Sequence, residues 1–250
     1  MRKAIFILTF ALCTFNTYSQ IMFTGFIDKH PIELAADISS EGIVDAVYVY
    51  SNYNEPIILS GTLKNNKLVL YEKGSKNKNR AKFTFNKFYS NTNRQEGIWT
   101  DLRTNKELKI SLNKTFEINY GDTIEWKNKE LLQPVSINNK YFRLIVSKSK
   151  DFYYATVSEI KIIEKKTNKL IQTINVDCQL NGLNSISTGD FNFDGVLDFS
   201  IFETSYSGAN SSSLYYLYDK KSSKYIESGF TGISLEFDPK TKRIYERNQC

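Results

Sequence analysis

The chain is poor in the residues on which many catalytic and metal centres depend. It has one histidine, three cysteines, four prolines and two tryptophans among 250 residues. Any mechanism that needs an imidazole must therefore use His30, which precedes Pro31 in a polar turn beside Asp28. We expect a solvent-exposed turn histidine at this position rather than a catalytic one.

Sequence signatures of common enzyme classes are absent as well. There is no G-x-S-x-G nucleophile motif, no P-loop and no dinucleotide-binding fingerprint. One histidine with scattered cysteines does not make a zinc site, and a cysteine nucleophile would have to combine Cys178 or Cys250 with His30. A carboxylate pair for glycoside cleavage stays open, because the 27 acidic residues cannot be paired in space from sequence. We predict that the protein is not an enzyme.

Long hydrophobic runs are also missing, and the one apolar run lies at the amino terminus. Arg2 and Lys3 precede a short apolar stretch from residue 4 to residue 13, which is too short to span a bilayer. This pattern predicts a signal peptide over residues 1–19, with Gln20 as the mature terminus. Leu12 stands before Cys13 where a lipobox has a small residue, which disfavours lipidation. We expect an exported, soluble protein in the periplasm or outside the cell.

Removal of the signal would leave two cysteines, Cys178 and Cys250. In an exported chain two cysteines can form a disulfide. In the loop-entropy view, closing about 70 residues would stabilise the fold by roughly 4 kcal/mol. The alternative is two separate thiols, one buried and one at a frayed end.

The charge balance is moderately basic. The signal holds two of the 33 bases and none of the 27 acids, which leaves the mature chain at +4. Local clusters of bases at 73–82 and 161–169 fall in polar turns, where we expect solvated hairpin tips; a weak attraction to anionic partners is the alternative. No nucleic-acid-binding module is recognisable, so nucleic acid is not an expected partner.

Hydrophobic residues alternate with polar ones through most of the chain, the period of half-buried strands. Polar turns recur about every ten residues, and no window shows a convincing helical stripe, although 128–137 could hold one short turn. The pattern predicts an all-β protein: an antiparallel, barrel-like meander over residues 20–113, and a second β domain over 114–250 that contains the segment 190–198. The expected strands are 22–27, 32–38, 43–50, 57–63, 67–71, 81–88, 95–101, 107–112, 141–147, 156–164, 169–176, 199–203, 213–218, 224–228, 234–237 and 243–247.

One segment carries a dense chemical motif. Residues 190–198 have the form D-x-N-x-D-G-x-x-D, the first nine positions of a calcium loop. Hard Ca²⁺ prefers six to eight oxygen ligands. The predicted ligands are the side chains of Asp190, Asn192, Asp194 and Asp198 and the carbonyl of Val196. Because Ile201 stands where an EF-hand has glutamate, and the flanks read as strands, the nearer comparison is a calcium loop between strands. An acidic turn without metal is the alternative, and a bound ion could be purely structural.

A small, polar stretch follows at 204–213, with tyrosine-rich residues after it. Small residues let a loop approach another surface closely, and tyrosines supply amphipathic contact area. We predict a partner-binding loop here, with Tyr206, Ser207, Gly208 and Asn210 as its contact residues. An ordinary hairpin tip is the alternative.

Three segments of the second half occur in a suggestive order. They are the strand–turn–strand over 157–174, the loop over 189–198 and the run Leu214-Tyr215-Tyr216-Leu217-Tyr218-Asp219. Over roughly residues 140–230 the chain resembles the calcium-binding periplasmic immunity proteins of the xanthomonad type. That resemblance implies a propeller-like fold, bound Ca²⁺ and inhibition of lysozyme-like peptidoglycan hydrolases delivered by type IV secretion. Ser207-Gly208 is also similar to the Ser-Gly loop that lysozyme inhibitors of another type insert into the enzyme cleft.

These features lead to one principal functional hypothesis and two alternatives. The principal one is an exported, calcium-stabilised β protein that binds and inhibits another protein, with a cell-wall hydrolase as candidate partner. The first alternative is an extracellular carbohydrate- or surface-binding module whose tyrosines and tryptophans stack on sugar rings. The second is a glycoside or peptidoglycan hydrolase.

Overall fold

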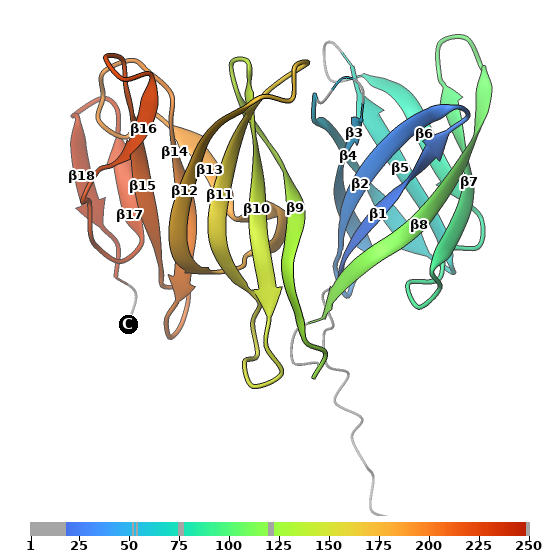
Figure 1. Cartoon of the computed structure of the whole chain (residues 1–250), viewed down its shortest axis with the longest axis horizontal. Coiled ribbons are helices and arrows are strands. Elements are labelled where there is room, and N and C mark those ends of the chain that lie inside the picture. Colours follow the sequence, from blue (N-terminus) through green and yellow to red (C-terminus); the bar gives the residue numbers. More distant parts are fainter. Residues whose placement is uncertain (1–18, 52, 54, 75–77, 120–122, 249–250) are drawn as a thin grey trace, which may run out of the picture.

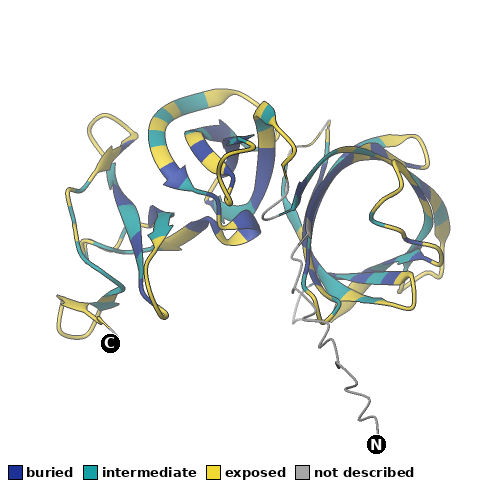
Figure 2. Cartoon of the chain, turned by 90° about the horizontal axis from the view of Figure 1, so that it is seen from below, coloured by how far each residue is buried: buried dark blue, intermediate teal, exposed yellow. Residues whose placement is uncertain are grey.

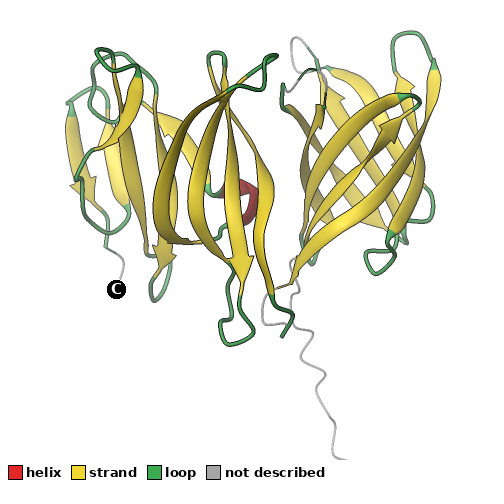
Figure 3. Cartoon of the chain, in the orientation of Figure 1, coloured by secondary structure: helices red, strands yellow, loops and turns green. Residues whose placement is uncertain are grey.

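The structure is a computed structural model that describes residues 19–51, 53, 55–74, 78–119 and 123–248. Residues 1–18 of the predicted signal and Cys250 lie outside the described residues. Within these ranges strands dominate, joined by turns and by a short 3₁₀ helix, η2 (Gly182–Asn184) (Figure 3). Across the described ranges, no helix has the length and apolar character needed to cross a membrane.

The first half is a closed antiparallel barrel of eight strands, as the meander pattern predicted (Figure 1). Each strand pairs with the next, and the last pairs with the first from Ser19↔Asn119 to Ile27↔Ile110. The strands are β1 (Ser19–Ile27), β2 (His30–Ile38), β3 (Ile43–Tyr50), β4 (Ile57–Lys64), β5 (Lys67–Lys73), β6 (Asn79–Phe85), β7 (Arg94–Asp101) and β8 (Glu107–Asn119).

The barrel interior is filled with side chains. Successive residues of a strand point to opposite faces, so Ile21 and Phe23 lie in the barrel core while Met22 packs outside it. Phe88, from the loop after β6, joins this core and contacts Phe23 at a ring-centroid distance of 6.2 Å. Figure 2 shows the barrel end-on, with buried residues around its wall.

The second half contains two four-stranded antiparallel meanders and a hairpin. The first meander has β9 (Trp126–Ile137), β10 (Lys140–Lys148), β11 (Thr156–Glu164) and β12 (Leu170–Gln179). The second has β13 (Ile186–Gly189), β14 (Asp198–Ser205), β15 (Ser211–Asp219) and β16 (Lys224–Glu227), and the hairpin has β17 (Leu235–Asp238) and β18 (Arg243–Glu246). The meanders have the four-stranded form of propeller blades, without a closed ring among the described residues.

One apolar core joins the barrel to the second half. Met22, Ala35, Val47 and Val49 face outward from the barrel and belong to the same buried cluster as the second-half strands. The barrel wall thus forms one side of the core beneath β9, and the two parts lie side by side (Figures 1 and 2).

Two predictions about the middle of the chain were wrong in detail. The predicted domain boundary at 113/114 falls inside β8, which continues to Asn119 as part of the barrel. The segment 128–137, for which a short helical turn was considered, is the strand β9. Contacts with the barrel strands β2 and β3 and with η2, together with the pairing to β10, override the weak local preference of this segment.

Candidate calcium loop

The D-x-N-x-D-G-x-x-D segment connects β13 to β14, two strands whose ends are paired as Gly189↔Asp198. This pairing brings the first and ninth motif positions to the same end of the sheet. The turn between β15 and β16 lies at this end too, at the top left of Figure 1. The strand-flanked context that the sequence predicted for the loop is therefore confirmed.

The loop folds around its own oxygen-bearing side chains. The Asp190 carboxylate accepts hydrogen bonds from the backbone N–H groups of Asp194 (3.0 Å) and Gly195 (2.9 Å). Asn192 Oδ1 accepts one from Asp194 N (3.0 Å), and Asp194 Oδ1 one from Val196 N (2.8 Å). Gly195 has a φ of +82°, the left-handed region that glycine adopts without strain. The first three predicted ligands thus lie on one compact turn.

Asp198 fixes this turn to the sheet. It is fully buried, and its carboxylate accepts hydrogen bonds from Phe191 N (3.0 Å) and Tyr218 N (2.8 Å). Burial raises the pKa of Asp198 above its ordinary value, the two backbone N–H groups oppose this, and the charges of Asp194 and Asp190 add to the rise. Asp198 therefore links the loop to β15.

Aromatic side chains of the loop hold the carboxy-terminal hairpin. The Phe191 ring lies 4.9 Å from that of Tyr215 and 4.8 Å from that of Phe237, and Phe193 lies 6.4 Å from Phe237. A two-stranded hairpin is marginal alone in water, and β18 is exposed along its whole length. The order of the loop is thus coupled to the docking of β17.

The donor chemistry of the loop fits a hard cation, although its carboxylates alone do not. Among the described residues, no three or more His, Cys, Asp or Glu side chains are grouped so that they could hold a metal ion. A cation here would need the Asn192 amide oxygen and the Val196 carbonyl beside the carboxylates of Asp190, Asp194 and Asp198, an all-oxygen set of the kind Ca²⁺ prefers. The nearby Lys220 Nζ lies 4.0 Å from Asp194 Oδ2, an exposed pair that contributes little.

The predicted partner loop joins β14 to β15 at the other end of the sheet. Tyr206 is 48% exposed, and Ser207 and Gly208 are exposed as well. Asn210 is different: it is buried, and its Nδ2 donates a hydrogen bond to Asn248 Oδ1 (3.1 Å). Three of the four predicted contact residues are thus accessible, whereas Asn210 anchors the loop to the segment after β18.

The ion loop does not border this partner loop. The eight residues of β14 separate them, which corresponds to about 26 Å at roughly 3.3 Å per residue. A cation in the loop 190–198 could act on Tyr206 only through the sheet and the hairpin that both loops contact. The partner loop is instead held by Tyr206 N to Asn210 O (2.9 Å) and by Asn210 itself.

Cys178 is a buried thiol at 3% exposure in β12, and no disulfide partner for it lies within the described part of the chain. Burial is the main cause that raises the pKa of this thiol to about 12, with Glu203, Asp177 and Glu227 adding to it. Cys250 lies outside the described residues, so the bridge between the two stays a prediction. His30 is exposed, as expected from its turn.

An aromatic tip between β10 and β11 was missed from the sequence, although three successive aromatic residues in a turn were a readable signal. Phe152, Tyr153 and Tyr154 are 66%, 60% and 41% exposed. Beneath them the ammonium of buried Lys148 donates to Ser149 O (2.9 Å) and Phe152 O (2.5 Å). Figure 1 shows this hairpin projecting at the lower edge of the second half.

Comparison of the chain with protein-family models, with curated proteins and with solved structures found no match in any of the three.

Proposed function

We propose that this protein is an exported, calcium-stabilised β protein that binds and inhibits another protein, with a peptidoglycan hydrolase as first candidate. The observation that carries the ion part is the fold of 190–198, where Asp190, Asn192 and Asp194 are gathered on one turn and Asp198 closes it onto β15. The oxygen spacing and the resemblance over 140–230 support the same view.

The ion would act on stability rather than on chemistry. When bound, Ca²⁺ would neutralise carboxylates that otherwise repel one another. Asp190, Asn192, Asp194 and Asp198 would hold it with the Val196 carbonyl. Because Phe191 and Phe193 pack on Phe237, a more ordered loop would also fix the carboxy-terminal hairpin.

Inhibition would occur by occlusion. The loop 206–210 exposes the small residues Ser207 and Gly208 beside a single tyrosine, Tyr206, so it could enter a narrow cleft. Its backbone bond from Tyr206 N to Asn210 O limits the entropy lost on binding. The lack of a recognisable catalytic constellation in the sequence agrees with a binding role.

The test is an inhibition assay with a lysozyme-type peptidoglycan hydrolase. The variant Tyr206→Ala should weaken inhibition at least tenfold. The matched control is Tyr89→Ala, which removes a similarly exposed tyrosine (44% against 48%) from a barrel loop and should inhibit like the unaltered protein. No inhibition by the unaltered protein across a panel of such hydrolases would contradict the proposal.

A second candidate function is a carbohydrate- or surface-binding module, favoured by the aromatic tip. Phe152, Tyr153 and Tyr154 are the kind of side chains that stack on sugar rings. The Tyr153 and Tyr154 rings stand at 77° to each other, so they do not form one flat platform, which is why this function ranks second. Saturable sedimentation with insoluble peptidoglycan that is lost in Tyr153→Ala would favour it over inhibition.

A further inference from the structure

The barrel wall has a gap between β6 and β7. The two strands pair only over Ala81–Thr84 against Ile98–Asp101. The amino-terminal part of β7, before Ile98, is not paired with β6, but it stays paired with β8 as far as Arg94↔Asn113. The backbone of residues 94–96 therefore has a strand neighbour on its β8 side only, although the Arg94 carbonyl already accepts a hydrogen bond from Thr92 Oγ1 (3.3 Å). Unpaired strand edges of this kind are templates for another chain.

An open groove of about 850 Å³ lies along this gap. Its lining includes three bases, Lys87, Arg94 and Lys109, and one acid, Glu96. Ile98 supplies apolar surface, whereas the Ile110 side chain is buried in the barrel core. Glu96 is paired with Arg94 at 2.9 Å, which leaves Lys87 and Lys109 as the net positive charge. The groove thus combines apolar surface with an excess of positive charge.

The gap is built into the fold rather than frayed. Phe88 is buried in the barrel core and anchors the loop that leaves β6. The side-chain amide of Gln95 donates to Tyr89 O (2.6 Å) and to Thr92 Oγ1 (2.7 Å).

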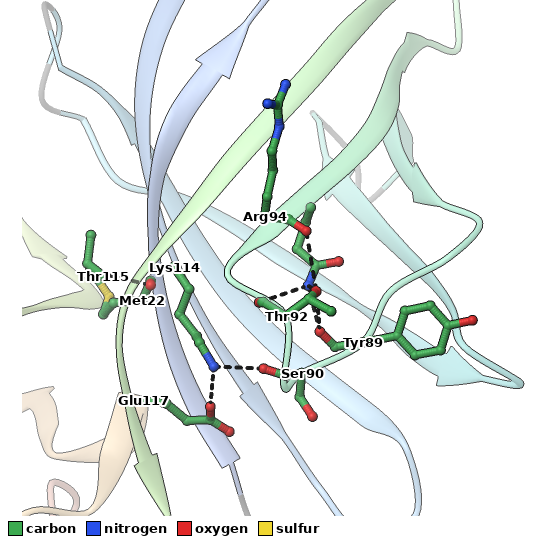
Figure 4. A network of polar contacts seen from close by, with 9 residues as sticks. Met22, Tyr89, Ser90, Thr92, Arg94, Lys114, Thr115 and Glu117 are labelled. Atoms are coloured by element: carbon green, nitrogen blue, oxygen red, sulfur yellow. Dashed lines mark hydrogen bonds and ion pairs between the residues drawn. The ribbon is translucent and has the colours of Figure 1, made fainter.

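A second anchor comes from β8. Lys114 Nζ donates to Ser90 O (2.9 Å) and contacts Glu117 Oε2 at 2.7 Å (Figure 4). Figure 4 also shows the Arg94 side chain extending away from this network, while its carbonyl oxygen accepts a hydrogen bond from Thr92 Oγ1 (3.3 Å). The loop is therefore held against β8, and it cannot fall into the groove to pair with β7 without losing these bonds.

One polar atom on a residue that lines the groove, Thr84 Oγ1, has no hydrogen-bond partner within the described part of the chain. Buried polar atoms in native proteins are nearly always satisfied, and each exception calls for a partner.

Gly97 keeps the gap narrow where it begins, next to the last β6–β7 pair, Thr84↔Ile98. A Cβ at this position would lie 2.6 Å from both Thr84 O and the Phe85 ring. Only glycine lets β6 and β7 approach closely here. The groove therefore begins directly next to Thr84↔Ile98, the last paired residues of the two strands, and continues the line of the β6–β7 ladder.

We propose that this groove binds an extended, acidic peptide segment, which adds to the free edge of β7 as a short strand. Its backbone would pair with the remaining free groups of residues 94–96, continuing the ladder that β6 leaves. Acidic side chains on one face would meet Lys87 and Lys109, and apolar ones would cover Ile98. A free edge of backbone selects a peptide over a small anion, because an anion leaves the edge unpaired. This site lies on the barrel and is independent of the calcium loop and of hydrolase inhibition.

The probe is an end-blocked heptapeptide of alternating glutamate and valine, measured by fluorescence polarisation and by amide chemical shifts of the mature protein. We expect saturable binding with shifts in residues 94–96. The double variant Lys87→Glu/Lys109→Glu should weaken it at least tenfold. The control double variant Lys64→Glu/Lys67→Glu, which reverses two exposed barrel lysines, should bind like the unaltered protein.

Two further peptides separate strand addition from simple charge attraction. A peptide with lysine in place of glutamate should not bind, and one that is N-methylated at alternate residues should bind at least tenfold more weakly because it cannot complete a ladder. The proposal would be overturned if the N-methylated peptide, or the lysine peptide, bound with the same affinity as the acidic peptide. Absence of binding by the acidic peptide up to millimolar concentration would overturn it too.

Discussion

Replacing Arg143 with alanine should destabilise the whole protein, because this side chain is a buried polar link between the barrel and the second half. Its guanidinium is 8% exposed and lies on β10, 2.7 Å from Glu33 of β2 and 3.6 Å from Glu130 of β9. The Tyr141 ring lies 5.8 Å away. Arg143 therefore joins two strands of the first meander to the barrel wall.

The size of the effect follows from burial. Removing one partner of a buried pair costs about 3–5 kcal/mol, since the other charge is left uncompensated. Glu33 is 27% exposed at its side chain and can recover some water, so we expect a loss of about 2–3 kcal/mol. With a urea dependence of about 1–3 kcal/mol per molar, the unfolding midpoint should fall by roughly 1 M.

The two tryptophans allow each half to be followed separately. Trp99 lies in the barrel and Trp126 in β9, so Trp99→Phe and Trp126→Phe leave one fluorophore per half. Because one apolar core spans both halves, the two transitions should coincide and should shift together in the Arg143→Ala background. A double-mutant cycle with Glu33→Gln should return a coupling of at least about 1 kcal/mol.

Two results would refute this reasoning. A destabilisation below about 0.5 kcal/mol would place Arg143 among weak surface pairs. A shift of the Trp126 transition without one of the Trp99 transition would show that the interface does not couple the halves.

Three further predictions concern single residues. Burial and the charge of Asp45 raise the pKa of Asp37 from 3.8 to about 6, so the folded state is destabilised at pH 7 and regains stability as the pH falls through 6 towards 3.8. Asp37→Asn should therefore stabilise the protein by roughly 1–2 kcal/mol at pH 7, after a discount for solvent screening, and should have little effect at pH 3.5. Urea-induced unfolding at both pH values measures this difference. The side-chain amide of Gln172 accepts a hydrogen bond from Tyr225 N (2.9 Å) and donates one to Tyr225 O (2.8 Å). Gln172→Ala should lower the free energy of unfolding by about 2 kcal/mol in the same assay. A loss near zero would show that water replaces the amide. The Cys178 thiol, with its pKa raised to about 12 by burial, should react with a thiol reagent at pH 8 at least a hundredfold more slowly in the folded than in the unfolded protein.

Most strands could be predicted because their alternation reflects one buried face. The predicted 43–50 and 156–164 coincide with β3 and β11. β8 was cut short because Thr115 is an extra residue opposite Met22 and Phe23, a bulge that breaks the alternation. The Thr115 hydroxyl donates to Met22 O at 3.1 Å (Figure 4). The local sequence pattern cannot reveal such a register shift, because the shift depends on the partner strand.

β9 was missed for a different reason. Leu131, Leu132 and Gln133 are buried in succession, because β9 contacts the barrel strands β2 and β3 as well as η2 and β13, and its register against β10 shifts next to these residues. A strand that is buried on both faces loses its period of two. The oxygen spacing of 190–198 located the candidate ion site, but the packing of Phe191 on Phe237 and the β6–β7 gap arise from contacts distant in sequence, so no local motif could indicate them.

The central claim, that 190–198 is a calcium loop, is tested most directly by thermal melts of residues 20–250 with Ca²⁺ and with a chelator. We predict a higher melting temperature with Ca²⁺, and loss of that difference in Asp190→Ala and Asp194→Ala. The difference between the two conditions is the decisive quantity, since Asp190→Ala also removes two backbone hydrogen bonds in the absence of metal. Identical melting of the unaltered protein with and without chelator would contradict the account.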